Sequence, residues 1–285
     1  MLLEKVVRKS LTIRPSGRST DFISPSFGHG CLYDCTYCYM KRHKPDGLDI
    51  AKNTGDILSE ISSHAYFDTT EKPNQTHEKY VTYDIACNED FALHSKFHNW
   101  KRIFEFFRTH PIAMGSLATK FVNEKFLEFN PEGKVRIRFS LMPQKYSELL
   151  EQDTSSIDER IEAIDRFIEA GYDVHINFSP VIVVDGWLDE YKKLFEQVNE
   201  KVKHKDKVKC EVIFLTHNTD KHNYNLEYEL PGEELLWFPE RQEAKLSEFG
   251  GKNLRYNWQL KSDYIKEFKY LHNQIIPWCT IRYIF

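Results

Sequence analysis

The feature that most constrains the fold of this 285-residue chain is a repeated alternation of short β-branched runs with segments of helical periodicity. The predicted strands are 20–26, 80–86, 112–118, 135–142, 173–184 and 208–216. The predicted helices are 56–65, 96–108, 156–170 and 188–202, with a short helix near Asn123. Ser156 and Gly171 are the predicted start and stop signals of the third helix. About six βα units in succession favour a parallel sheet with helices outside, so the predicted fold class is α/β, a partial (β/α)6 TIM-type barrel.

The segment downstream of residue 217 breaks this alternation. Gly250-Gly251 predicts a turn between 245–248 and 254–258, which favours a β-hairpin, and the last apolar run alternates as a strand does. We therefore predict three parts: an N-terminal extension of residues 1–19, a barrel of residues 20–217, and a C-terminal extension of residues 218–285 packed on the barrel.

The composition is that of a globular protein, with 41% hydrophobic and 29% charged residues. The net charge of −4 argues against an obligate nucleic-acid binder, although the basic run 41–44 could contact phosphate locally. No apolar run approaches the ~20 residues of a membrane span, and the first residues do not form a signal peptide. The expected location is the cytoplasm, with no membrane contact.

Three cysteines stand close together, with three and then two residues between them: Cys31, Cys35 and Cys38. In a large cytosolic chain such a cluster indicates metal binding rather than disulfides. A structural zinc site normally takes four ligands, whereas a four-iron cluster on three thiolates keeps one iron open. The spacing leaves two interpretations: such an iron–sulfur cluster, or a zinc site completed by His29, His43 or a distant cysteine.

The run from Gly28 to Tyr39 resembles the cluster loop of the radical S-adenosylmethionine (SAM) superfamily. The similarity lies in the three-then-two spacing, the aromatic Tyr37 and the position after a first strand. The resemblance implies two cofactors, a 4Fe-4S cluster on the three cysteines and SAM on the open iron. It also implies that one electron from the cluster cleaves SAM to a 5′-deoxyadenosyl radical.

Further segments resemble the spore photoproduct lyase family, which repairs a thymine dimer in DNA by a radical route. These segments lie between about residues 20 and 216, with a thinner echo to the C-terminus. They are Gly30–Tyr39, Tyr83–Asp90, Thr119–Phe121, Arg138–Ser140, Arg160–Ala163, Ala170–Tyr172, Ser179–Ile182 and Gly186–Trp187. Two stretches depart from the family: Asn88-Glu89-Asp90 replaces Thr-Ser-Asp, and Thr216-His217-Asn218-Thr219 replaces a Thr-His-Arg-Phe-like run.

The resemblance also implies roles for individual side chains. Cys87 would donate a hydrogen atom to the substrate radical, and Tyr37 and Tyr39 would relay the radical or lie beside the cofactor. Lys120 and Ser140 would hold the carboxylate of SAM, and Asp90 or Glu89 its ammonium, which are charge-complementary pairings. Independently of the family, Cys87, Lys120 and Ser140 each fall at the C-terminal end of a predicted strand, where βα barrels place their active sites.

Two further cysteines are predicted to be structural. Cys210 lies inside a predicted strand and Cys279 in the terminal apolar run, so that they are too isolated in the sequence to form a second cluster.

Three functions follow from these observations. The first is a radical SAM lyase that reverts a thymine dimer, the spore photoproduct, to two thymines. The alternatives are a radical SAM relative acting on RNA, a peptide or a small metabolite, and a zinc protein or binding module without catalysis. For the first we expect damaged DNA as partner, an external electron donor such as a flavodoxin or ferredoxin, and a monomeric chain.

Overall fold

The computed structural model describes residues 2–44, 47–68, 70–246 and 252–285, which form two compact units. The first unit comprises the residues up to 32, residues 43–139 and residues 163–175. The second comprises residues 33–42, residues 140–162 and the chain from residue 176 onward. These two units are defined by contacts between residues. The predicted division into three parts at residues 19 and 217 stays a prediction.

The main sheet has eight strands in the order β14-β10-β9-β8-β7-β6-β3-β2, and β8 and β9 contribute residues to both units. Their bounds are β2 (Arg14–Pro15), β3 (Phe22–Ile23), β6 (Val81–Asp84), β7 (Ala113–Thr119), β8 (Val135–Leu141), β9 (Asp173–Val181), β10 (Lys209–Phe214) and β14 (Thr280–Ile284). The pairs β3–β6, β6–β7, β7–β8 and β10–β14 are parallel, and β2 is antiparallel to β3. Parallel strands joined by helices confirm the predicted α/β class.

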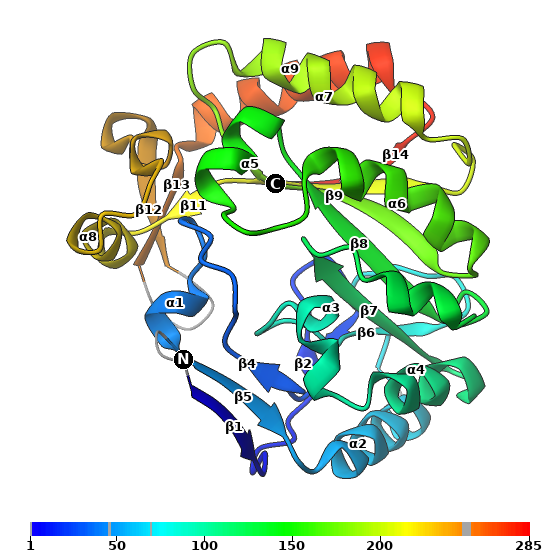
Figure 1. Ribbon diagram of the computed structural model, residues 1–285. Coiled ribbons are helices and arrows are strands. Elements are labelled where there is room, and N and C mark those ends of the chain that lie inside the picture. The colour runs from blue at the N-terminus through cyan, green and yellow to red at the C-terminus, as the bar shows by residue number, and fades with distance from the viewer. Residues whose placement is uncertain (1, 45–46, 69, 247–251) are drawn as a thin grey trace. The chain divides into compact units, whose positions relative to one another are not determined.

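The first unit surrounds its strands with amphipathic helices. Its helical elements include α2 (Thr54–Phe67), α3 (Phe91–His94), α4 (Trp100–Thr109), and the 3-10 turns η1 (Ser95–Phe97) and η2 (Glu124–Glu128). In α4 the buried residues Trp100, Ile103, Phe104 and Phe107 recur at helical spacing, which gives the helix one apolar face. A separate three-stranded sheet contains β1 (Leu2–Val6), β5 (Gly47–Ala51) and β4 (Gly28–His29), seen side by side in Figure 1.

Helix α6 (Ile157–Glu169) lies within one residue of the predicted helix 156–170 at each end. The Ser156 hydroxyl accepts a hydrogen bond from the Glu159 backbone N–H at 3.2 Å, and the Glu159 carboxylate accepts one from the Ser156 N–H at 2.7 Å. This reciprocal pair is a capping box. After the helix, Gly171 adopts a φ of +95°, and a Cβ there would lie 2.0 Å from the Asn130 side chain, so only glycine fits.

The second unit contains the described chain downstream of β9. Its further elements are α5 (Gln144–Leu150), α7 (Trp187–Lys201), β11 (Thr216–His217), α8 (Thr219–Glu227), η3 (Glu233–Leu235), η4 (Pro239–Arg241), β12 (Gln242–Leu246), β13 (Lys252–Tyr256) and α9 (Trp258–Ile275). Antiparallel pairing of β12 with β13 confirms the predicted hairpin, whose predicted turn at Gly250-Gly251 lies outside the described residues. Helices α7 and α9 pack together (Figure 1). None of the helices in the described segments is long and apolar enough to cross a membrane.

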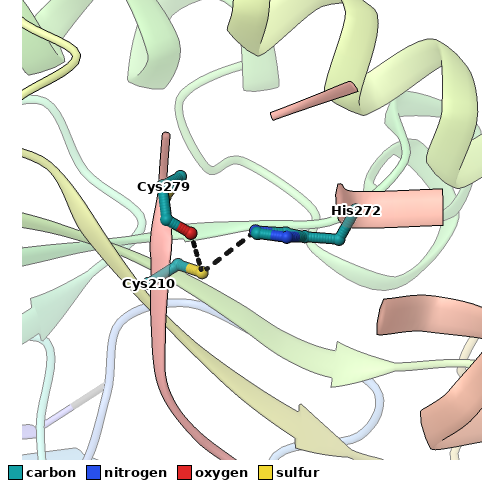
Figure 2. A group of neighbouring side chains, drawn as sticks. All are labelled: Cys210, His272 and Cys279. Carbon is teal, nitrogen blue, oxygen red and sulfur yellow. Dashed lines mark hydrogen bonds between the residues drawn. The ribbon is translucent and has the colours of Figure 1, made fainter. Parts of the chain in front are cut away.

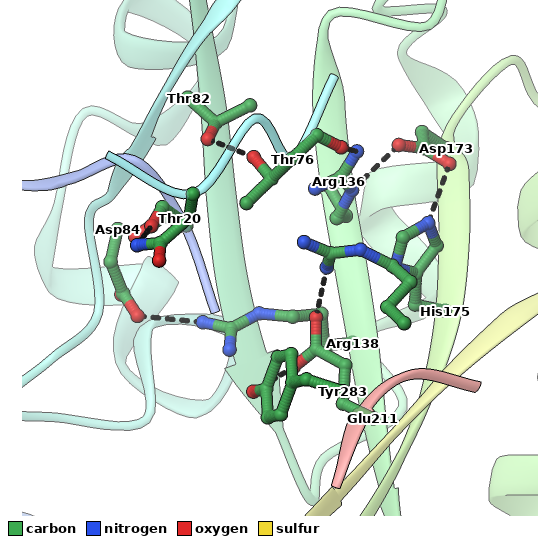
Figure 3. A network of polar contacts seen from close by, with 12 residues as sticks. Thr20, Thr76, Thr82, Asp84, Arg136, Arg138, Asp173, His175, Glu211 and Tyr283 are labelled. Carbon is green, nitrogen blue, oxygen red and sulfur yellow. Dashed lines mark hydrogen bonds and ion pairs between the residues drawn. The ribbon is translucent and has the colours of Figure 1, made fainter. Parts of the chain in front are cut away.

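Strand β8 separates a polar face from an apolar one. Arg136 donates to Asp173 at 2.7 Å and Arg138 to Asp84 at 2.6 Å, as Figure 3 shows. On the opposite face, the Phe139 ring packs against Phe167 of α6, with ring centroids 5.2 Å apart. The alternation of arginine with apolar residues therefore divides an ionic layer from the helix-covered core.

The second unit has its own buried ion pair, made by Glu211 of β10. Its carboxylate accepts hydrogen bonds from Arg282 at 2.5 Å and from the Tyr283 hydroxyl at 2.8 Å, both on β14. These bonds attach the last strand of the chain to β10 in addition to the parallel backbone pairing.

Candidate functional site

The cysteine cluster lies in an irregular loop between β4 and α1 (Met40–His43). Cys35 is buried, Cys31 and Cys38 are half-buried, and none of the three belongs to a disulfide among the described residues. The backbone N–H of Cys38 donates to the Cys35 carbonyl at 2.8 Å, which closes a tight turn. Cys31 belongs to the first unit, whereas Cys35 and Cys38 belong to the second, so the loop has a separate set of anchors in each unit.

In the first unit, a buried histidine holds the peptide that follows Cys31. The Leu32 N–H donates to Nε2 of His94 at 3.2 Å. Because Nε2 accepts this bond, Nδ1 carries the hydrogen and donates to Glu89 Oε2 at 3.0 Å. The same carboxylate oxygen also contacts His98 Nε2 at 2.9 Å. Glu89 therefore orients His94, and His94 fixes the backbone beside the first cysteine.

The Glu89 carboxylate is fully buried and remains ionised. Burial by itself would raise its pKa, but His98 and His94 outweigh burial and hold the pKa below its ordinary range. Its second oxygen, Oε1, has no hydrogen-bond partner in the part of the chain that the structure describes. Glu89 thus carries one oxygen committed to the histidines and one with unused acceptor capacity.

Asp90 positions the backbone of Lys120. Its carboxylate caps α3 through the Leu93 N–H at 3.2 Å and accepts from the Thr119 hydroxyl at 2.7 Å and from the Lys120 N–H at 2.9 Å. Both carboxylate oxygens are therefore engaged at the end of β7. Between the two predicted ammonium-binding residues, Glu89 has the oxygen without a partner.

Cys87 follows β6 and is half-buried. Burial, followed by the nearby Asp84 carboxylate, raises the pKa of its thiol to about 11, despite the opposing effects of Arg14 and Arg138. At neutral pH the sulfur therefore keeps its hydrogen. The next residue, Asn88, accepts a backbone hydrogen bond from Gly30 at 3.0 Å, which attaches the start of the cluster loop to the segment that carries the thiol.

In the second unit, the middle of the cluster loop is attached by its backbone. The Thr36 N–H donates to the Leu150 carbonyl of α5 at 2.9 Å, and the Thr36 carbonyl accepts from the Asn225 amide at 3.1 Å. The Lys221 ammonium donates to the Tyr37 carbonyl. Helices α5 and α8 therefore fix all three peptide groups between Cys35 and Cys38.

Tyr37 is linked to a fully buried ion pair. Its hydroxyl donates to Glu151, which pairs with Arg160 at 2.8 Å and accepts from the Ser147 hydroxyl at 3.0 Å. Burial, and next the Glu151 carboxylate, raises the pKa of the Tyr37 phenol well above its ordinary value. Arg160 also donates to the carbonyl of Ser140 at 2.9 Å, so one arginine joins the tyrosine network to the end of β8.

Tyr39 has a different environment, because its side chain is 38% exposed. The Lys221 ammonium lies 6.0 Å from the centre of its ring. The two predicted relay tyrosines thus differ in solvent access.

The Asn225 side chain is held by the Glu233 carboxylate, which two histidines also contact. Glu233 accepts from Asn225, from His217 at 3.0 Å and from His222 at 2.6 Å. The His222 ring stacks on Trp237 with centroids 4.0 Å apart. His217, at the end of the last predicted barrel strand, is therefore part of the scaffold that holds the cluster loop.

The structure places the predicted site residues in two groups. The first unit contains Cys31, Cys87, Glu89, Asp90 and Lys120, and the second contains Cys35, Tyr37, Cys38, Tyr39 and Ser140. Their functional roles stay predictions.

Sequence reasoning missed His94, Glu151 and Glu233, which hold the loop without belonging to any motif. His94 and His98 are four residues apart, five and nine residues after Glu89. This spacing was the only local signal.

Comparison with known proteins identifies one family. Residues 3–285 match the family model described as spore photoproduct lyase. The spore photoproduct lyase of Bacillus subtilis (strain 168) is 27% identical over 198 residues, which cover 68% of this chain and 55% of that protein. The spore photoproduct lyase of Clostridium acetobutylicum is 25% identical over 285 residues, which cover 98% of this chain and 81% of that protein. This chain thus spans about half the length of the first relative.

Solved structures agree with this fold. A spore photoproduct lyase complexed with dinucleoside spore photoproduct superposes with a TM-score of 0.88 at 21% identity, covering 99% of this chain and 82% of the other. A spore photoproduct lyase double mutant with bound AdoMet and dinucleoside spore photoproduct gives the same TM-score at 19% identity and the same coverage. The likeness confirms the predicted partial barrel.

Proposed function

The chain belongs to the spore photoproduct lyase family, and from this premise we propose that it reverts the spore photoproduct in DNA to two thymines by radical SAM chemistry. The observation that carries the proposal is the placement of a protonated thiol. Cys87 keeps its hydrogen at neutral pH, and its neighbour Asn88 is bonded to Gly30 at the entrance of the cluster loop.

The residues present fit both cofactors. Three thiols on an irregular loop suit a 4Fe-4S cluster with one open iron. The unpartnered Glu89 Oε1 suits the ammonium of SAM, and Lys120 and Ser140 suit its carboxylate. When bound, the cluster and SAM would supply the 5′-deoxyadenosyl radical that hydrogen abstraction from the lesion requires.

The protein's own residues complete the reaction. Cys87 donates its thiol hydrogen atom to the thymine radical that remains once the bond between the bases has broken. The thiyl radical left on Cys87 would regain its hydrogen as one electron from the tyrosine pair Tyr37 and Tyr39 and one proton from solvent, so that the radical moves to a tyrosine. A phenol loses its electron most readily together with its proton, and the Glu151 carboxylate that accepts the Tyr37 hydroxyl is in place to take that proton.

Two partners belong to this proposal. Damaged DNA supplies the substrate, and the lesion would be extruded from the duplex at a cost of a few kcal/mol, which is smaller for a damaged pair. An external one-electron donor of the flavodoxin or ferredoxin kind would reduce the cluster. A monomeric chain and a cytoplasmic location stay predictions.

One observation favours a different substrate for the same radical chemistry. The family carries an arginine where this chain has Asn218, and the Asn218 side chain caps α8 by accepting from the Lys221 N–H at 2.8 Å. A cationic side chain is thus replaced by a structural cap. A radical SAM enzyme acting on RNA, a peptide or a small metabolite is therefore the second candidate.

The test uses anaerobically reconstituted full-length protein with dithionite, SAM and DNA carrying the spore photoproduct. Thymine and 5′-deoxyadenosine are quantified together. Thymine formation supports the proposal, whereas deoxyadenosine release that is independent of the lesion supports the second candidate. Protein that contains zinc in place of iron contradicts both.

Cys87→Ala tests the donor. We expect deoxyadenosine formation to continue while the thymine yield falls and other products appear, and Cys87→Ser should behave alike because an O–H bond is too strong to donate. An unchanged thymine yield in Cys87→Ala would show that another group supplies the hydrogen.

A further inference from the structure

Three metal-ligating side chains meet in the core of the second unit. Cys210 lies on β10, His272 in the last turn of α9, and Cys279 immediately before β14. Their ligand atoms all lie within 4.8 Å of one another, and Figure 2 shows the Cys210 sulfur beside the His272 ring and the Cys279 carbonyl. The prediction that these cysteines are isolated is wrong, because the parallel pairing of β10 with β14 brings residues 69 positions apart together.

The cluster is sealed from water. Cys210 and Cys279 are completely buried and His272 is 2% exposed. The rings of Phe195 and Phe268 lie 5.8 and 6.4 Å from the imidazole. The polar contacts inside are weak: Cys210 Sγ lies 3.6 Å from His272 Nε2 and 3.7 Å from the Cys279 carbonyl oxygen. Sulfur is a weak hydrogen-bond partner, so a metal ion would be a stronger partner for this buried imidazole.

The spacing matches a tetrahedral zinc site. Zinc–sulfur and zinc–nitrogen bonds of about 2.3 and 2.0–2.1 Å at a tetrahedral angle place sulfur and nitrogen about 3.6 Å apart. The distance from Cys210 Sγ to His272 Nε2 is 3.6 Å. The carbonyl oxygen of Cys279 also lies on this side of the cluster, 3.7 Å from Cys210 Sγ.

The charges also balance. Two thiolates and a neutral imidazole neutralise a divalent cation, so zinc could be buried here without a net charge. On the other side of the imidazole, Nδ1 contacts the Asn273 side-chain oxygen at 3.4 Å, which keeps the hydrogen on Nδ1 and leaves Nε2 to bind.

We propose that Cys210, His272 and Cys279 form a structural zinc site, separate from the cysteines of the cluster loop. The ion would join α9 and β14, the last two elements of the chain, to β10. Its role is stability, because zinc that binds only the folded chain adds its binding free energy to folding.

The experiment must remove the other thiolate site first. We would purify the full-length chain with Cys31, Cys35 and Cys38 all replaced by alanine, and measure zinc by elemental analysis after dialysis. We expect about one zinc ion per chain. Adding Cys279→Ser or His272→Ala should reduce the bound zinc more than about tenfold, whereas adding Cys87→Ser should leave it unchanged.

Two measurements on the same background do not depend on the folding of core variants. Cobalt replacing zinc should give the intense visible bands of tetrahedral cobalt with a sulfur-to-cobalt charge-transfer band. Zinc should also protect Cys210 and Cys279, but not Cys87, from alkylation under mild denaturant, and a chelator should abolish the protection. The proposal would be overturned if the purified chain lacks stoichiometric zinc and added zinc leaves the alkylation of Cys210 and Cys279 unchanged. A disulfide between Cys210 and Cys279 in protein purified without oxygen would also overturn it. Thymine formation by the wild-type chain is a separate readout, so failure of either proposal is recognised independently.

Discussion

Gly28→Ala tests whether the Glu89 carboxylate is fixed as tightly as its contacts indicate. A Cβ at residue 28 would lie 2.3 Å from Glu89 Oε2 and 2.4 Å from its carboxyl carbon. Residue 28 cannot retreat easily, because its backbone pairs with Ile50 in the β4–β5 ladder. Normal contact therefore requires the carboxylate to move by about 1 Å.

That displacement has a calculable cost. Oε2 is the oxygen that receives both histidines, His94 at 3.0 Å and His98 at 2.9 Å. A hydrogen bond to a charged group contributes about 1.5–3 kcal/mol, and overpacking a core costs about 1–3 kcal/mol. Loss of one bond together with overpacking predicts a decrease of about 3–5 kcal/mol in the free energy of unfolding, a large part of a typical domain's stability.

Urea unfolding followed by circular dichroism measures this change. Gly17→Ala is the matched control, because a Cβ there meets no atom within 4 Å, and its effect should stay within about 0.5 kcal/mol. Glu89→Ala provides the second control, since removing the carboxylate makes room for the new methyl group. In that background Gly28→Ala should cost less than about 1 kcal/mol, a coupling of at least about 2 kcal/mol.

The reasoning is refuted if Gly28→Ala costs the same with and without the Glu89 side chain, or no more than Gly17→Ala. Either result would mean that the loop relaxes without disturbing the carboxylate. The iron content of reconstituted Gly28→Ala protein is a useful second readout, because Glu89 acts on the peptide beside Cys31 through His94.

Two further predictions concern ionisation. Burial alone would raise the pKa of Asp173, but His175 and Arg136 outweigh it and hold the pKa below its ordinary value. The folded state therefore binds this proton more weakly than the unfolded state, so the stabilisation is present above about pH 4 and is lost as the pH falls through the folded pKa. Asp173→Asn should lower the free energy of unfolding in urea by about 3–5 kcal/mol at pH 7 and by clearly less at pH 3. The control Glu124→Gln removes an exposed ion pair and should cost less than about 1 kcal/mol. Equal penalties for Asp173→Asn at the two pH values would contradict this prediction. For Cys87, a pKa of about 11 predicts that iodoacetamide reacts at pH 8 about 100-fold more slowly than with an ordinary thiol. The rate should rise tenfold per pH unit up to about pH 10, as measured by mass spectrometry of the modified peptide. A rate that reaches a plateau near pH 9 would disprove the assignment.

The parts of the fold that could be predicted are those with a strong local period. Strand 135–142 was recognised from its alternation and is observed as β8, and the helix at 156–170 was bounded by its start signal Ser156 and its stop signal Gly171. Helix α9 was missed because its buried residues are Phe268 and His272, too few for an apolar stripe. The sheet that contains β1, β4 and β5 was missed because β4 is two residues long.

The site divides in the same way. The cysteine spacing is local and could be recognised at once. The groups that hold the loop act over long separations, 62 positions between Leu32 and His94 and 114 between Tyr37 and Glu151, and no local pattern encodes such contacts.

The ion pairs of strand β8 disfavour a shifted strand register during folding. A slip of one residue along β7 would turn Arg136 and Arg138 into the apolar layer of Phe167 and would point Phe139 at the carboxylate of Asp84. Each guanidinium left without its partner would cost several kcal/mol, so a shifted intermediate is penalised at two places at once. The ion pairs thus specify the register of the strand. This matters in a parallel sheet, because its strands are far apart in the sequence and pair slowly during folding.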